Sequence, residues 1–330
     1  MTLEAPMARL RAHVRSLWPR APILPALPFT GWALFSLLRG QVRWELILLG
    51  LFGLLTPYIS PLTKTLYLGL MPAGFVAVLY DAMGFVKNVG ITPERVHLCD
   101  LRALEIRWFG VSVNGQMGTV HDWLQPRATL AADVFFSIPY ATFLEAIVAF
   151  AVFAYAVRDY DVMRRFTWCF FALSVMGFAT YHLYPAAPPW YYHAHGCRAD
   201  LSMPASTGPN LARVDAWTHI PYFASFYGRA SDVFGAVPSL HVAYPLIIVL
   251  EGWKTFARGG GFKWPLRALA VLFCAWMCCA AVYLDHHWVI DVMVGLFYGV
   301  IAHVTVHVVS LVARRQPLVA RRAAADSLQK

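Results

Sequence analysis

Charged residues are scarce in this sequence, and their scarcity excludes an ordinary soluble domain. Only 14% of the 330 residues are Asp, Glu, Lys or Arg, whereas soluble domains typically contain about 25%. The six cysteines form no paired CxxC pattern of a zinc site, and neither an internal repeat nor a cleavable leader before residue 22 stands out. Hydrophobic residues make up 59% of the chain. The composition therefore predicts a single multi-pass membrane domain.

Apolar runs of the length needed to cross a bilayer, about 20 residues, recur along the chain. We expect an all-α, polytopic membrane helical bundle with about eight spans, in which two short spans, or a re-entrant hairpin, precede a core of six helices. The chain then divides into a basic N-terminus with short apolar helices (1–60), a main membrane domain (61–312) and a basic cytoplasmic tail (313–330). The expected spans are 24–38, 44–59, 63–83, 131–157, 166–185, 238–253, 268–285 and 288–312.

The distribution of basic residues predicts the topology of this integral membrane protein. The net charge is +9, and positive residues cluster next to apolar runs at 9–20, 158–165, 254–267 and 314–322. Such clusters mark the cytoplasmic segments of membrane proteins, so we do not expect nucleic acid as a partner. The same rule places the turn 285–288 and the loops before residues 130 and 236 on the extracytoplasmic (periplasmic or lumenal) face.

A polar motif lies where one apolar run ends and the last begins. The segment 283–291 reads YLDHHWVID. His287 and Asp291 are four residues apart, so a helix would place them on neighbouring turns of one face. A carboxylate there can accept a hydrogen bond from one imidazole nitrogen and leave the other nitrogen free to attack. Ionisable residues entering a membrane helix are costly and indicate function; the alternative is an interfacial pair that ends two helices.

A second motif, FGAVPSLH at 234–241, precedes another apolar run. Pro238 and Ser239 suit the start of a helix, where free backbone N–H groups favour an anion. His241 would stand beside that anion, on the same outer face as His287. Two histidines, one of them backed by a carboxylate, suggest phosphoryl transfer through a phosphohistidine.

These motifs resemble the type 2 phosphatidic acid phosphatase superfamily, and more closely its inositol phosphorylceramide synthase branch, the target of aureobasidin A. Two further stretches carry the resemblance, YPAAPPWY at 184–191 and LARVD at 211–215. The four stretches are short, but their order and spacing together are specific, and the likeness covers roughly residues 130–310. It implies a six-helix phosphatase-like core, which would make the main membrane domain the catalytic domain.

Departures from the general superfamily pattern imply a transfer reaction rather than hydrolysis of a phosphomonoester. Pro-Ser-Leu-His stands at 238–241 where the pattern has Ser-Gly-His, Ala280 and Ala281 replace Ser-Arg, and the Ala-Pro-Pro-Trp stretch replaces Arg-Pro. The synthase branch resembles this chain in the same replacements. A site with fewer cations around the phosphate suits a phosphodiester donor, which carries less charge than a monoester. The resemblance to the synthase branch implies transfer of a phosphoinositol-type headgroup from a phosphatidylinositol-like glycerophospholipid to a ceramide-like alcohol.

The candidate residues receive the following roles. His287 is the expected nucleophile, Asp291 would hold its imidazole, and His241 would protonate the leaving alcohol and deprotonate the incoming one. Each of the remaining candidates has an alternative to substrate binding. His286 could serve only in packing, Arg213 could be an exposed loop residue, and the aromatic pair at 190–191 could belong to a membrane aromatic belt. The expected substrate-binding residues are Ser239, His286, Arg213, Trp190 and Tyr191.

Two other functions and a metal site are alternatives. With water as the acceptor, the protein would be a lipid phosphate phosphatase. Buried His and Asp could also carry protons through a transporter, but here the charged residues lie at helix ends rather than near mid-membrane. A metal at His241, His287 and Asp291 is not expected, because no third anchored carboxylate accompanies them, and we expect no cofactor.

Two further expectations concern residues outside these motifs. Cys99 and Cys197 both fall in loops assigned to the outer face, where oxidation is allowed, and we predict a disulfide between them. His303 and His307 lie near the inner end of the last span, more than two turns from the motif carboxylate. We interpret them as interfacial residues.

Overall fold

The chain folds into a bundle of helices whose ranges match the expected spans. The computed structural model describes residues 4–41, 43–86, 89–203, 206–228 and 233–327, with the backbone alone for residues 4, 5 and 315–327. The prediction of an all-α polytopic bundle is confirmed. The helices of the bundle are α2 (Leu27–Leu38), α3 (Trp44–Ile59), α4 (Pro61–Val86), α7 (Leu130–Ala156), α8 (Tyr160–Leu183), α12 (Leu240–Thr255), α13 (Lys263–Tyr283) and α14 (Val289–Ser327).

Length and hydropathy make most of these helices suitable for crossing a membrane. Within the described residues, five helical stretches are long and apolar enough to do so, one of them being α12 and α13 joined through the 3₁₀ turn η3 (Phe256–Phe262). The helices α2 and α3 are apolar but shorter. The backbone of α14 continues without a break to Ser327, so it includes most of the segment expected as a tail; residues 328–330 lie outside the described part.

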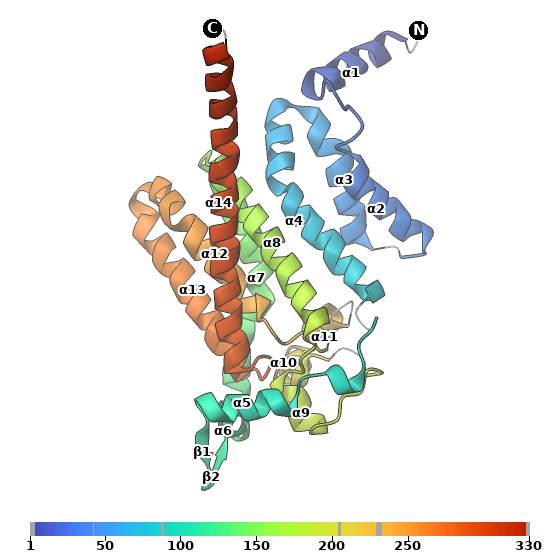
Figure 1. Ribbon diagram of the computed structural model, residues 1–330. Helices are drawn as coiled ribbons and strands as arrows, with labels where there is room; N and C mark the ends of the chain where they lie inside the picture. The colour runs from blue at the N-terminus through green and yellow to red at the C-terminus, as the bar shows by residue number, and fades with distance from the viewer. Residues whose placement is uncertain (1–3, 42, 87–88, 204–205, 229–232, 328–330) are drawn as a thin grey trace.

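The core of the bundle lies where α7, α8, α12, α13 and α14 meet. Fully buried side chains from four of these helices pack there, among them Phe166, Ile247, Met277 and Ala302. The helix α4 packs against α8 from one side, and α2 and α3 pack against each other and α4 (Figure 1). The amphipathic α1 (Glu4–Leu17) precedes this group. Because α12 contacts α7, α8, α13 and α14, its first residues are held from several sides.

Small elements cover one end of the bundle and form what we call the cap. They come from the segments between α4 and α7 and between α8 and α12, and they lie at the bottom of Figure 1, opposite the two chain ends. A short β-hairpin within the cap is the one strand structure among the described elements. The cap elements are η1 (Pro93–Arg95), α5 (Cys99–Phe109), β1 (Val111–Val113), β2 (Gln116–Gly118), α6 (Val120–Leu124), η2 (Gln125–Arg127), α9 (Pro189–His195), α10 (Gly208–Thr218) and α11 (Tyr222–Tyr227).

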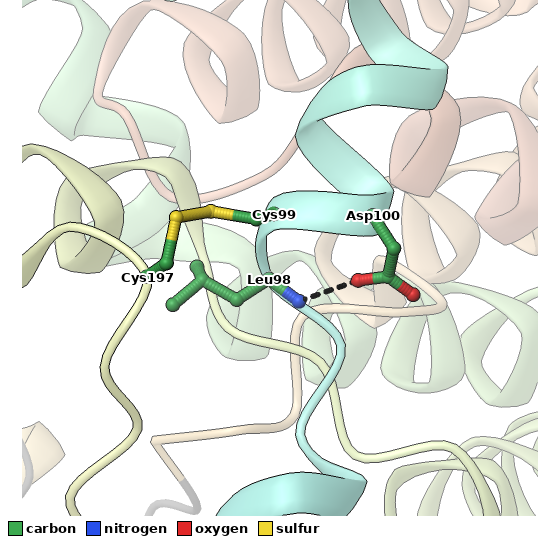
Figure 2. Close-up of a disulfide and its surroundings, with 4 residues drawn as sticks. All are labelled: Leu98, Cys99, Asp100 and Cys197. Atoms are coloured by element: carbon green, nitrogen blue, oxygen red, sulfur yellow. Dashed lines mark hydrogen bonds between the residues drawn. A yellow bond between two sulfur atoms is a disulfide. The ribbon is translucent and has the colours of Figure 1, made fainter.

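A disulfide joins the two segments of the cap. Cys99 and Cys197 are 98 residues apart in sequence, their Cα atoms lie 5.6 Å apart, and their sulfur atoms are bonded (Figure 2). Beside the bridge, the backbone N–H of Leu98 donates to the Asp100 carboxylate at 2.9 Å. The predicted disulfide is thereby confirmed. It links the start of α5 to the chain just after α9.

Backbone hydrogen bonds between three distant segments complete the cap. The N–H of Ala187 donates to the carbonyl of His97 at 2.9 Å, and the N–H of Ala236 donates to the carbonyl of Ala186 at 3.1 Å. The Ala-Pro-Pro-Trp stretch therefore lies between the start of α5 and the segment that leads into α12. This arrangement fixes the position of Ala236 next to the helix that carries His241.

Candidate active site

The two motif histidines lie side by side under the cap. His241 is the second residue of α12, and His287 stands in the turn before α14. The Nδ1 atom of His241 is 3.3 Å from the Nε2 atom of His287. A Cβ on Gly295 would lie 2.3 Å from the carbonyl oxygen of Ser239, so a glycine is needed for α14 to approach the start of α12 this closely.

The tautomer of His287 follows from its neighbours. Its Nδ1 atom is 2.9 Å from the carbonyl oxygen of Ala236, and a carbonyl can only accept, so Nδ1 carries the proton. The lone pair is then on Nε2, the atom that faces His241. An imidazole with this orientation has its nucleophilic nitrogen directed at the shared space between the two rings.

The acceptor for His287 differs from the one expected. The nearer oxygen of Asp291 lies 3.7 Å from Nδ1, beyond an ordinary hydrogen bond. That oxygen instead accepts from the backbone N–H of Trp288 at 2.8 Å. A backbone carbonyl thus holds the imidazole, while the buried carboxylate stands close enough to interact with a positive charge on the ring.

The turn that carries His287 is also fixed from the cap. The side chain of Glu105, on α5, accepts from the backbone N–H of Val289 at 2.9 Å and of Ile290 at 3.2 Å. The indole N–H of Trp288 donates to the carbonyl of Ala187 at 2.9 Å. A carboxylate is well placed at a helix N-terminus because the free N–H groups there carry partial positive charge. The cap therefore sets where α14 begins.

Burial keeps the histidines of this turn neutral. It lowers the pKa of His287 to about 4 and the pKa of His286 to about 4. Both rings are therefore unprotonated near neutral pH, and the Nε2 lone pair of His287 is available for attack. The chemistry that this arrangement allows is nucleophilic attack by one histidine next to a second that can hold or release a proton.

Comparison with known proteins gives the family of this chain. A family model described as the PAP2 superfamily matches residues 110–305. The chain belongs to the PAP2 superfamily. That range includes every catalytic and substrate-binding residue predicted from the sequence, and the resemblance inferred from the motifs is confirmed.

Several curated proteins are similar to this chain. Phosphoinositol dihydroceramide synthase of Bacteroides thetaiotaomicron is 32% identical over 80% of this chain and 85% of its own length. Inositol phosphorylceramide synthase of Candida albicans is 26% identical over 73% of this chain, and the catalytic subunit AUR1 of Saccharomyces cerevisiae is 25% identical over 79%. The alignments span 48% and 62% of these fungal proteins. No solved structure matches significantly.

His286 has different hydrogen-bond partners from those of its neighbour. Its Nε2 atom donates to the carbonyl of Thr207 at 2.7 Å. Its ring lies between those of Tyr140 and Tyr227, with centroid distances of 5.4 and 5.3 Å. Of the two roles considered for His286, these contacts favour packing.

The aromatic residues of the Ala-Pro-Pro-Trp stretch support the cap. Tyr191 is fully buried, and its hydroxyl accepts from the backbone N–H of Asp200 at 2.8 Å, so it does not lie in an exposed aromatic belt. The backbone N–H of Trp190 donates to the carbonyl of Asp285 at 3.0 Å. A Cβ on Gly208 would lie 3.2 Å from the Trp190 ring and 3.4 Å from His286. Trp190 therefore borders the site through Gly208.

Arg213 forms an ion pair rather than standing free in a loop. Its Nε donates to the carboxylate of Asp133 at 2.7 Å, and the amide of Asn210 donates to the other oxygen at 3.0 Å. Asp133 is fully buried, while 44% of the Arg213 side chain is exposed. This pair joins α10 to α7. Among the described residues, Arg213 forms its hydrogen bond and ion pair with Asp133 and with neither His241 nor His287.

Three buried oxygens near the histidine pair have no hydrogen-bond partner among the described residues: the hydroxyls of Ser239 and Tyr140 and the Oδ1 atom of Asp291. The Tyr140 ring stacks on His241 with centroids 4.4 Å apart and planes 17° apart. Buried polar groups are nearly always paired in native proteins, so these atoms are suited to contact a bound substrate. Ser239 was expected in this role, whereas an aromatic residue within an apolar run carries no signal that would have identified Tyr140.

A charged network that the motifs did not reveal lies directly behind the catalytic turn. The two oxygens of Asp285 lie 3.0 Å from His121 Nδ1 and 2.7 Å from His193 Nδ1. His193 Nε2 is 3.1 Å from Asp122, which Arg102 contacts at 2.8 Å. Burial alone would raise the pKa of Asp285, but the two histidines hold it below its usual value. Burial alone would lower the pKa of His193, but the two carboxylates raise it.

This network predicts a pH dependence of stability. The pKa of His193 is higher in the folded protein than in the unfolded chain, where it is about 6.5. Protonated His193 therefore contributes its full stabilisation at a pH below about 6.5. That stabilisation is lost as the pH rises through the pKa of the folded state. The pKa of Asp285 is lowered in the folded protein, so the pH dependence is reversed. The stabilisation that ionised Asp285 contributes is lost only as the pH falls into the acid range. We expect His193→Gln to lower the free energy of unfolding by about 2 kcal/mol near pH 6. The difference from wild type should become smaller as the pH rises.

Thermal unfolding of the detergent-solubilised protein across a pH series measures this effect. The matched control is His195→Gln, because His195 is an exposed residue of the same helix. Parallel pH profiles for wild type and His193→Gln would contradict the assignment.

Proposed function

We propose that this membrane protein is a lipid phosphotransferase that moves a phosphoinositol-type headgroup from a glycerophospholipid to a ceramide-like alcohol through a phosphohistidine at His287. The observation that carries the proposal is the buried Nε2 lone pair of His287, held by Ala236 and placed 3.3 Å from His241. The similar proteins named phosphoinositol dihydroceramide synthase and inositol phosphorylceramide synthase support the substrate class.

The first half-reaction forms the phosphohistidine. Nε2 of His287 attacks the phosphorus atom of the donor, and the bond from phosphorus to the glycerolipid oxygen breaks as His241, which enters the step as the imidazolium and leaves it neutral, gives that oxygen a proton. A phosphorus atom within attacking distance, about 3–3.5 Å from the nucleophile, occupies the space that His241 Nδ1 now faces. Donor binding therefore breaks the contact between the two rings.

The second half-reaction returns the enzyme to its starting state. His241 takes the proton of the acceptor hydroxyl, the acceptor oxygen attacks phosphorus, and the bond to His287 breaks. Phosphorylation at Nε2 places positive charge on the His287 ring, which the nearby Asp291 carboxylate stabilises. The unpaired hydroxyls of Ser239 and Tyr140 are in position to donate to phosphate or headgroup oxygens. In this mechanism Trp190 lies at the edge of the substrate site, while Arg213 holds α10 to α7 through Asp133.

We place this chemistry on the extracytoplasmic face. The cap over the histidines contains the Cys99–Cys197 disulfide, and disulfides persist in oxidising compartments. The opposite end of the bundle carries the basic turns expected in the cytoplasm, with Arg165 near the start of α8 and Arg258 in the turn after α12. Both substrates are lipids, so the donor and the acceptor reach the site from the membrane.

The ratio of products distinguishes a transferase from a phosphatase. Purified protein in mixed micelles receives a phosphatidylinositol donor with a labelled headgroup, with and without ceramide. We expect the labelled phosphosphingolipid to exceed free inositol phosphate by at least about tenfold, a preference of roughly 1.4 kcal/mol, because the buried site favours a lipid alcohol over water. Equal release of inositol phosphate with and without ceramide, with no phosphosphingolipid, would replace this proposal by the phosphatase.

A further inference from the structure

A second cluster of chemically reactive side chains lies at the end of the bundle opposite the cap. Cys169 on α8, Glu251 on α12 and His303 on α14 present one ligand atom each, and these atoms all lie within 4.8 Å of one another. The cysteine and the carboxylate are buried, and the histidine side chain is 23% exposed. His303 is twelve residues beyond Asp291 on the same helix, so the cluster lies about 18 Å along α14 from the proposed catalytic site.

The cluster is organised around a single carboxylate oxygen. The Oε1 atom of Glu251 lies 3.5 Å from the Cys169 sulfur and 2.8 Å from His303 Nδ1. His307, one turn further along α14, places its Nδ1 3.3 Å from the same oxygen. The other oxygen, Oε2, lies 3.3 Å from Arg165 Nε. One sulfur and two nitrogen atoms therefore converge on Oε1 from two neighbouring helices.

The distances from the Glu251 Oε1 atom to its neighbours are close to the distances between ligand atoms in tetrahedral coordination. Zinc binds nitrogen and oxygen at about 2.0 Å and sulfur at about 2.3 Å, so tetrahedral ligand atoms lie about 3.3 Å apart, or about 3.5 Å when one is sulfur. The Cys169 and His307 distances to the Glu251 oxygen match these values. His303 Nδ1 lies 2.8 Å from the Glu251 oxygen. These two atoms must move apart by about half an ångström to reach the spacing of tetrahedral ligands.

We propose that Cys169, Glu251 and His303 bind a divalent cation of the zinc class. Mixed sulfur, nitrogen and oxygen ligands select such borderline-soft ions over magnesium or calcium. The thiol proton of Cys169 leaves to solvent as the sulfur binds the metal. Arg165 then acts as the outer partner of the ligating carboxylate, an arrangement common around protein-bound metals.

The site would have a structural role and a route of entry. It joins α8, α12 and α14, and two of these helices carry His241 and Asp291 at their other ends. His307 is 38% exposed, so an ion can enter from the surface at this end of the bundle. The proposal is independent of the proposed reaction, and it leaves the expectation of metal-free chemistry at the histidine pair unchanged.

Metal content tests the proposal directly. Full-length protein purified without a polyhistidine tag is dialysed against zinc, then against metal-free buffer, and its zinc is measured by mass spectrometry. We expect about one zinc per chain. Cys169→Ser and His303→Asn should weaken zinc binding by at least about 10–100-fold, since the loss of outer partners alone has effects of that size. The matched control is Cys274→Ser, because Cys274 is another buried cysteine, on α13.

Cobalt provides a second measurement, and its main result needs only the wild-type protein. Wild-type protein loaded with cobalt should show the absorption of a thiolate–cobalt bond, retained in Cys274→Ser and absent from Cys169→Ser. Wild-type protein that retains no zinc and gives no thiolate–cobalt absorption would overturn the proposal. The cluster would then be a hydrogen-bonded ion pair of Glu251 and Arg165. Equal zinc in wild type, Cys169→Ser and His303→Asn would overturn it as well.

Discussion

Replacement of His287 by alanine is expected to abolish both headgroup transfer and labelling of the protein by the donor. The imidazole supplies the only protein atom that bonds to phosphorus in the proposed intermediate, so its loss removes the pathway rather than slowing one step. We expect the transfer rate to fall by at least about 10³-fold. The measurement uses a donor with radiolabelled phosphorus, detects acid-labile, base-stable label on denatured protein, and follows phosphosphingolipid formation in parallel.

The neighbouring histidine provides the sharpest control for this prediction. His286→Ala changes a ring of the same kind one residue away, but that ring donates to Thr207 and packs between two tyrosines. We expect it to lower activity moderately through lost packing while the protein remains labelled. His195→Ala, at an exposed position, should behave as wild type. If His286→Ala loses the label and His287→Ala keeps it, the nucleophile has been assigned to the wrong residue.

The helices could be predicted from the sequence because a bilayer imposes a length on each apolar run. The expected span at 44–59 and the helix Trp44–Ile59 coincide, and the other spans differ from their helices at the ends. The pairing of His241 with His287 was also accessible, since topology put both at the same end of the bundle. The cap was less predictable. Its β-hairpin and short helices are held by hydrogen bonds between distant segments and a disulfide, and these leave little periodicity in the sequence.

The details of the site depended on contacts that spacing cannot reveal. The i, i+4 relation correctly placed Asp291 near His287, but the acceptor at 2.9 Å is the carbonyl of Ala236, and a backbone acceptor has no side-chain signature. Asp285 stands within the motif that we singled out, yet its partners His121 and His193 are 164 and 92 residues away. Only the folded cap brings these residues together, so the network became visible only in the structure.

Replacement of His241 by alanine is expected to produce a defect that depends on the leaving group of the donor. In the proposed mechanism His241 donates a proton to the glycerolipid alcohol, which is a poor leaving group without it. General acid–base groups contribute about 10²–10⁴-fold, and His241→Ala should lose a factor in this range with a phosphatidylinositol donor. With a nitrophenyl ester of phosphoinositol, the leaving phenolate needs no acid, and the first half-reaction should slow by less than about tenfold.

The second half-reaction makes this prediction specific to a histidine that serves both steps. The ceramide-like acceptor still requires a base, so the His241→Ala protein should release one burst of nitrophenol and then stall with label on His287. Wild type should turn over the same donor without accumulating label, and His287→Ala should give no burst. The stacking of Tyr140 on His241 offers another comparison, because Tyr140→Phe preserves the ring and should preserve the response to the leaving group. A His241→Ala protein that is slowed equally with both donors would show that His241 positions the substrate without transferring the proton.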